Sequence, residues 1–132
     1  MKKENIVLIV DQDHTRKNNI SSRLRMMGYS TELSSSGFQA ISLLEESNTS
    51  SKVYKLVVIV GESEDMPGRE ILLLMRQVND NKKRLPILFV NPENDPTHII
   101  QVIKEGANDY IVETQNDGQI VTKIQKLAPL AT

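Results

Sequence analysis

The sequence contains no cysteine, which excludes disulfide bonds, thiolate metal sites and cysteine nucleophiles. It also has almost no excess charge, because 16 Lys and Arg residues nearly balance 17 Asp and Glu residues to give a formal net charge of −1. A chain so close to neutral has no overall electrostatic attraction to nucleic acid or to an anionic membrane. We therefore expect neither of them as a partner of this domain.

Long apolar runs are missing as well. The first apolar run, residues 6–10, is only five residues long and ends at Asp11, which is too short for a signal peptide. No other run approaches the length of a membrane span, so we expect a cytoplasmic protein. A length of 132 residues, with 39% hydrophobic and 25% charged residues, suffices for one domain with its own core. We predict a single domain over residues 1–132, which is either the whole protein or the first domain of a longer one.

What the chain does have is an alternation of short apolar runs with segments of helical periodicity, repeated five times. This pattern is typical of a parallel sheet that is covered on both faces by helices. Right-handed crossovers between successive strands then give a doubly wound α/β fold. The expected strands are 6–10, 29–33, 55–60, 86–90 and 108–112; the expected helices are 14–27, a segment after the 34–37 turn, 69–78, 97–105 and one opening at 116–118.

Binding chemistry in such a fold lies at the carboxyl ends of the strands. In this chain Asp11, Val60, Asn91 and Glu113 occupy those ends. We therefore expect these four residues and their loops to form the candidate site.

Five segments, in the same order along nearly the whole chain, resemble the receiver domain of bacterial response regulators. They are Ile-Val-Leu-Ile-Val-Asp with Gln-Asp-His, Ser-Ser-Gly-Phe-Gln-Ala-Ile-Ser-Leu-Leu, Tyr-x-Leu-Val-Val-Ile, Leu-Pro-Ile-Leu-Phe-Val and Lys-Glu-Gly-Ala-Asn-Asp-Tyr-Ile. The resemblance implies a CheY-like (flavodoxin-like) sandwich of five parallel strands in the order 2-1-3-4-5.

The same resemblance implies a phosphorylation pocket in which most positions are changed. Asp11 retains the first of two metal-binding acids, but its neighbour is Gln12 and the phosphoacceptor aspartate is replaced by Val60. The hydroxyl residue that would follow the phosphoryl group is Asn91, and the lysine that would neutralise it is Glu113. We therefore predict a degenerate phosphorylation pocket.

These changes all weaken the chemistry of phosphoryl transfer. A valine has no nucleophilic oxygen, an amide is a poor ligand for a hard cation, and Glu113 places a negative charge where a cation is needed. The proline expected after that position is Thr114, so we expect a trans peptide bond there. We predict a phosphorylation-independent pseudo-receiver that is not an enzyme and uses no cofactor.

A different register of the third strand is possible. Aligning residues 66–68 with the Met-Pro-Gly that often follows the phosphoacceptor puts Ser63 in the acceptor position. The strand would then have to continue across Gly61 and Glu62, whereas the apolar run ending at Val60 is the better anchor. No aspartate occupies the acceptor position in either register.

Other sites are weaker predictions. A receiver still phosphorylated at Ser63, Glu62 or Asp65 is the main rival, and a flavin or nucleotide binder is a lesser one because the loop after the first strand is acidic. We expect no metal; Asp11, Asp13 and Glu62 are weak candidates within a solvated acidic rim. The two histidines, His14 and His98, are expected at the surface.

What remains is a surface for a protein partner or for dimerisation. Receivers generally signal through their fourth helix, fifth strand and fifth helix. In the fourth helix of this chain the apolar residues spread over a wide arc that comprises Ile99, Ile100, Val102 and Ile103. The alternative prediction is that these apolar residues only fill the core. The predicted interaction face comprises Ile99, Ile103, Tyr110, Lys123 and Lys126. On the third helix, we expect Ile71, Leu74, Met75 and Val78 to form the core stripe, which leaves Leu73 pointing outward as a lesser candidate.

Overall fold

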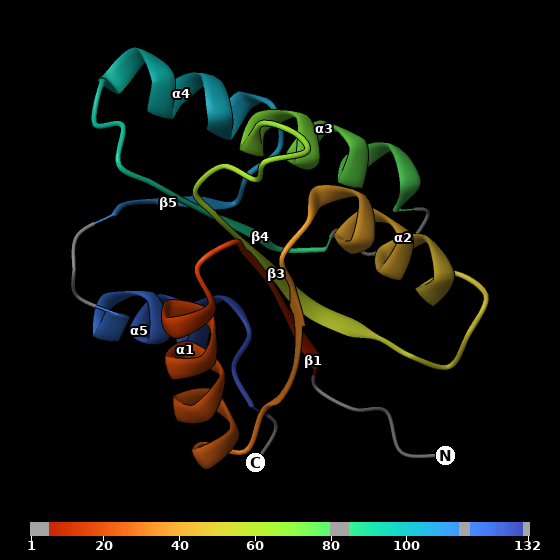
Figure 1. The fold of residues 1–132 in the computed structure, drawn as a ribbon. Coiled ribbons are helices and arrows are strands. Elements are labelled where there is room, and N and C mark those ends of the chain that lie inside the picture. The colour runs from red at the N-terminus through yellow and green to blue at the C-terminus, as the bar shows by residue number, and fades with distance from the viewer. Residues whose placement is uncertain (1–5, 80–84, 114–116, 131–132) are drawn as a thin grey trace.

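The computed structural model describes residues 6–79, 85–113 and 117–130. Its five parallel strands form one sheet in the order β2-β1-β3-β4-β5, which confirms the predicted fold class (Figure 1). The strands are β1 (Ile6–Asp11), β2 (Ser30–Ser34), β3 (Tyr54–Val60), β4 (Ile87–Asn91) and β5 (Asp109–Val112). The helices are α1 (His14–Met26), α2 (Gly37–Ser47), α3 (Gly68–Val78), α4 (Pro96–Lys104) and α5 (Asp117–Leu127).

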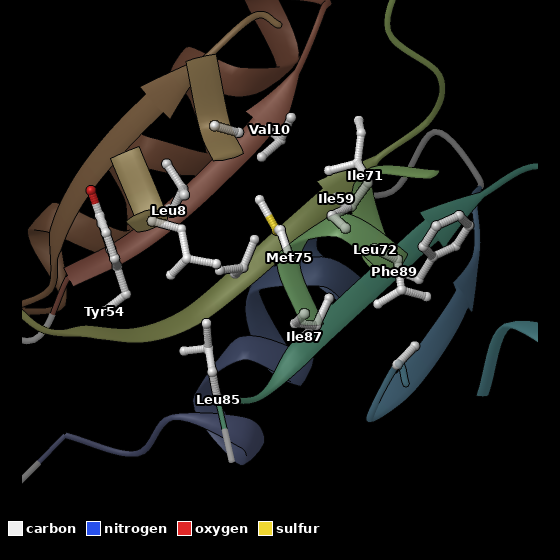
Figure 2. Packing of buried hydrophobic residues seen from close by; sticks show 14 of the residues in the cluster. Leu8, Val10, Tyr54, Ile59, Ile71, Leu72, Met75, Leu85, Ile87 and Phe89 are labelled. Carbon is white, nitrogen blue, oxygen red and sulfur yellow. The ribbon is translucent and has the colours of Figure 1, made fainter. Parts of the chain in front are cut away.

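The sheet is the middle of three layers. Helices α1 and α5 cover one face, and α2, α3 and α4 cover the other (Figure 1). Side chains of β1 alternate between the two cores: Val7 and Ile9 join the cluster under α1 and α5, whereas Leu8 and Val10 join the cluster under α2 and α3 (Figure 2). Burial on both faces explains why the central strands are unbroken apolar runs in the sequence.

Local signals fix where the helices begin. Asp13, Ser36 and Asp95 each stand just before a helix, and their side chains accept a hydrogen bond from a backbone N–H of its first turn. A proline, Pro96, follows Asp95 at the start of α4, where its missing N–H would have no helical partner anyway. The predicted and observed bounds accordingly differ by a single residue where they differ.

The core stripe of α3 was predicted incompletely. Leu72 is fully buried although the sequence pattern did not include it, and the predicted Leu74 and Val78 are only partly buried. Helix α3 lies between α2 and α4 as well as on the sheet (Figure 1), so its buried surface is wider than the simple stripe that a covering helix needs. Leu73 does point outward, with 43% of its surface exposed.

The expectation that both histidines lie at the surface is only half correct. His14 is exposed, but His98 is partly buried and its ring meets the Tyr110 ring edge-on at 5.9 Å between centroids. The buried Nε2 of His98 has no hydrogen-bond partner among the described residues. His98 is therefore a packing residue of the β4–α4 region.

Within the described ranges, no helix combines the length and the apolar character needed to span a bilayer.

Candidate functional site at the carboxyl end of the sheet

The strand register brings the predicted site residues to one edge of the sheet. Asp11 pairs with Val60, Val60 pairs with Val90, and Asn91 pairs with Val112, the residue before Glu113. The ends of β1, β3, β4 and β5 are therefore level with one another. An open cleft at this edge is lined by Asp11, Gln12, Asp13, Arg16, Val60, Gly61 and Glu62.

Strand β3 ends at Val60, whose side chain is 97% buried and packs in the core under α1 and α5. Gly61 then takes a positive φ of 65°, a conformation that favours glycine, and its N–H donates to the carbonyl of Val90 at 2.7 Å. The alternative register requires the strand to continue across Gly61 and Glu62, but β3 ends at Val60. Ser63 lies in the following loop, where its N–H donates to the carbonyl of Met66 at 3.3 Å.

Asp11 is bound by an arginine that the sequence analysis missed. The Nε of Arg16 donates to Oδ2 of Asp11 at 2.6 Å, and Nη2 donates to Oδ1 at 2.8 Å, which is a two-pronged contact. The remaining Nη1 of Arg16 donates to Oε1 of Glu113 at the end of β5. The hydrogen bonding of Arg16 to the Asp11 carboxylate is the main reason why the pKa of Arg16 is raised. Asp11 itself is 99% buried, and its carboxylate forms an ion pair with this guanidinium.

The other polar side chains of the pocket are turned toward backbone or toward each other. Gln12 accepts a hydrogen bond from the N–H of Glu64 at 2.6 Å. Glu62 accepts from the N–H of Gly68 at 2.6 Å and from the Nδ2 of Asn91 at 3.2 Å. These contacts tie the β3–α3 loop to the ends of β1 and β4.

Asp65 leaves the pocket altogether and binds the start of α2. Its carboxylate accepts from the N–H groups of Phe38 (2.9 Å) and Gly37 (3.0 Å) and from the hydroxyl of Ser36 (3.1 Å). The backbone hydrogen bonds from Phe38 and Gly37 are the main causes that lower the pKa of Asp65. No local pattern could have revealed this contact, because 27 residues separate Phe38 from Asp65 along the chain.

The residues present do not fit the divalent cation that the family resemblance implies. Both carboxylate oxygens of Asp11 are bound by Arg16, and Val60 offers no ligand atom. Asp13 caps α1 by accepting from the N–H of Arg16 at 3.0 Å, a contact that is the main cause of its lowered pKa. In the part of the chain that the structure describes, no three His, Cys, Asp or Glu side chains are placed to hold a metal.

On the predicted interaction face, α4 presents apolar side chains to solvent. Ile100 and Ile103 are 54% and 40% exposed, Ile99 is partly buried, and Val102 is completely buried. Ile100, the most exposed of the four, was part of the apolar arc in the sequence but not of the predicted face. Leu73 lies on the neighbouring helix α3, which an ion pair between Arg69 and Glu105 joins to the end of α4.

Tyr110 of β5 is anchored between the sheet and the β4–α4 loop. Its hydroxyl donates to the carbonyl of Glu93 at 2.7 Å, and its ring stacks on Phe89 at 5.7 Å between centroids. Burial is the first cause of its raised pKa.

The two predicted lysines of α5 have different surroundings. Lys123 forms an ion pair with Asp109 at the start of β5, at 2.9 Å. Lys126 is exposed and lines a basic cleft with Arg23 of α1. Thr114, predicted to follow a trans peptide bond, lies outside the described residues.

Comparison with known proteins agrees with this architecture. The chain matches the response regulator receiver domain family over residues 7–125. It is 26% identical over 124 residues to the two-component response regulator ORR11 of Oryza sativa, covering 93% of this chain and 80% of that one. It is 27% identical over 107 residues to the transcriptional regulatory protein ZraR of Klebsiella oxytoca, covering 81% of this chain but only 22% of that longer protein.

A solved CheY-like receiver domain from Methanospirillum hungatei has the same fold, with a TM-score of 0.79 and 21% identity, over 95% of this chain and 94% of that one. Together with the family match over most of the chain, the strand order and the site at the carboxyl edge of the sheet, this shows that the chain belongs to the response regulator receiver domain family of two-component signalling.

Proposed function

We propose that this receiver domain is a phosphorylation-independent interaction module, which acts by binding a protein partner or a second copy of itself. The observation that carries the proposal is Val60, a buried hydrocarbon side chain at the end of β3. By the family resemblance this is the position of the phosphoacceptor aspartate. Receiver domains are in general signalling modules rather than enzymes, and the loss of the acceptor leaves recognition as the remaining activity.

The charges around Val60 support the same conclusion. Phosphoryl transfer requires a nucleophile together with cations that stabilise the transferring oxygens. Here Glu113 stands at the position of the expected lysine, and the guanidinium of Arg16, which lines the cleft, is held by Asp11 and Glu113. An incoming phosphoryl group would therefore meet a carboxylate and no nucleophile.

The rival acceptors in the β3–α3 loop are poorly placed. The carboxylate of Asp65 is held at the start of α2, and that of Glu62 is held by Gly68 and Asn91. Ser63 lies three residues beyond Val60, past the Gly61 turn. The flavin or nucleotide alternative is weakened by the loop after β1, where Asp11 and Asp13 face the position that a phosphate would occupy.

The surface that best fits recognition is the face of α4, β5 and α5. Ile100 and Ile103 expose apolar surface there, beside the anchored ring of Tyr110. Because Tyr110 and Asn91 are both held by hydrogen bonds, we propose that the face keeps one conformation and is read constitutively.

The test is to incubate the protein with acetyl phosphate and Mg²⁺ and to measure its intact mass under neutral conditions. We expect no gain of a phosphoryl group in the wild type, with a phosphorylatable receiver treated in parallel as the positive control. A phosphoryl adduct on the wild type would overturn the proposal, and peptide mapping with Ser63→Ala would show which rival acceptor takes it.

A further inference from the structure

We infer that Arg16 is a built-in replacement for a pocket cation, and that its contact with Asp11 keeps divalent ions out even when an acceptor carboxylate is restored at position 60. The inference rests on the proposed function, because it concerns a pocket that no longer takes a phosphoryl group. It adds a second cause of that loss, separate from Val60.

The position of Arg16 is fixed by the turn that starts α1. Asp11 accepts a hydrogen bond from the N–H of Asp13 at 2.9 Å, and Asp13 accepts from the N–H of Arg16 at 3.0 Å. The backbone of Arg16 is therefore tied through Asp13 to the end of β1. From there the guanidinium folds back over the edge of the sheet and meets both oxygens of Asp11.

This contact competes directly with a metal ion. A divalent ion held by Asp11 would need at least one of the two carboxylate oxygens that Arg16 occupies. Keeping both cations on one carboxylate, 99% buried, would bring like charges together away from water. Because a guanidinium stays charged and is part of the chain, its competition with a metal ion does not depend on pH or on an added ligand.

Glu113 has a clear role in this arrangement. Its carboxylate accepts from Nη1 of Arg16, so one guanidinium joins the ends of β1 and β5. By the resemblance a lysine would supply the positive charge from the end of β5. In this chain the positive charge comes instead from Arg16 on α1, and the residue after β5, Glu113, is negative.

The experiment compares Mg²⁺ binding, followed by amide NMR, in three variants of the full chain. They are Val60→Asp, Val60→Asp with Arg16→Gln, and Val60→Asp with Arg23→Gln as the matched control. Arg23 is exposed and lies seven residues after Arg16 on the same helix. We expect Mg²⁺ to bind at least about tenfold more tightly when Arg16 is replaced than in the other two variants. Equal affinity in all three would overturn the inference.

A measurement on the wild type decides the question if the Arg16 variant does not fold. The Nε–H of Arg16 should exchange with solvent more slowly than that of Arg23, and 15N spectra should show no shift of this signal when Mg²⁺ is added. An exchange rate equal to that of Arg23, or displacement of the signal by Mg²⁺, would overturn the inference.

The two proposals fail in different ways. A phosphoryl adduct on the wild type would overturn the proposed function and leave the three-way comparison of Mg²⁺ affinity standing. Equal Mg²⁺ affinities would overturn the role of Arg16, while the wild type would still lack an acceptor at Val60.

Discussion

The pocket at the carboxyl edge of the sheet and the outer face of α4 differ in how far their side chains are satisfied by contacts within the chain. In the pocket, Asp11, Glu62 and Asn91 are all bonded to other groups of the same chain. On α4, by contrast, Ile100 and Ile103 expose apolar surface that nothing in the described chain covers. One region has its polar groups satisfied internally, and the other leaves apolar groups in water.

The difference indicates where a ligand can gain free energy. A ligand entering the pocket would first have to break the hydrogen bonds of the buried Asp11 and Asn91, and each unsatisfied buried group left behind would be unfavourable. A partner on α4 would only remove apolar surface from water, which is favourable at about 25 cal/mol per Å². This contrast supports the proposal that recognition uses the surface of α4 rather than the family's pocket.

Among the variants of the pocket and its loops, Arg16→Ala is expected to lose the most stability. The substitution leaves the buried Asp11 carboxylate without its guanidinium, and removing one partner of a buried ion pair is strongly destabilising. Because Arg16 is partly exposed, we expect a loss of about 2 to 3 kcal/mol in the free energy of unfolding. Urea denaturation measures it. The control Arg23→Ala should change the stability by less than about 0.5 kcal/mol, and equal losses would contradict the role given to Asp11.

Replacing Asp65 by Ala should have a smaller effect, about 1 kcal/mol, because it removes a carboxylate that caps the first turn of α2. The pKa of Asp65 is lowered in the folded state, so its contribution is present above the unfolded pKa near 4 and is lost as the pH falls through the folded pKa. The stability gap between wild type and variant should therefore narrow in acid.

Urea denaturation at about pH 7 and about pH 3 checks this sign. Glu64→Ala removes the adjacent exposed acid and serves as the control, with little effect expected at either pH. A gap that stays constant or widens in acid would show that the carboxylate of Asp65 does not hold the α2 terminus.

Tyr110→Phe tests whether the hydroxyl of Tyr110 anchors the β4–α4 loop beside the α4 face. The variant keeps the stacking on Phe89 and the contact with His98 but loses the hydrogen bond to the carbonyl of Glu93. We expect a loss of about 0.5 to 1 kcal/mol. Tyr29→Phe is the matched control, because its more deeply buried hydroxyl donates to the carbonyl of Ala128, and it should lose more stability. No loss at Tyr110 would mean that the loop is not anchored there.

Much of the fold could be predicted because its signals are local. Strands buried on both faces contain unbroken apolar runs, such as residues 56–60 of β3, and helix starts are marked by caps such as Asp13 and Ser36. The positions of Asp11, Val60 and Asn91 at one edge followed from the strand ends alone. The burial of Leu72 was missed because it depends on the packing of α3 between two helices as well as on the sheet.

The partners of the site residues were harder to predict than their positions. Asp65 meets α2 and Glu113 meets Arg16 across long stretches of sequence, so no spacing rule identifies either pair. Arg16 itself had a usable signal, since it lies on the first turn of a capped helix five residues after the strand-end acid. A positive charge there can fold back onto Asp11, which the comparison with the family's metal site alone did not suggest.

Ile100→Glu is expected to have the smallest effect on stability and the largest effect on recognition. Because this side chain is 54% exposed, a charge there should change the free energy of unfolding by less than about 0.5 kcal/mol. Binding through the α4 face should nevertheless fall at least about tenfold, since the apolar contact is replaced by a charge that must lose water. Light scattering after size exclusion tests self-association, and capture on immobilised domain tests a partner protein.

Two controls decide how such a result is read. Met26→Glu places the same charge on an apolar residue of α1 that is 88% exposed, so it should leave both stability and binding unchanged. Val102→Glu puts the charge on the buried side of α4 and should unfold the domain. If Ile100→Glu and Met26→Glu bind alike, the exposed residues of α4 are only surface, and the contrast between pocket and face loses its functional meaning. If Ile100→Glu loses binding and Met26→Glu keeps it, recognition depends on α4; when the assay contains no phosphoryl donor, that binding needs no phosphorylation in the pocket.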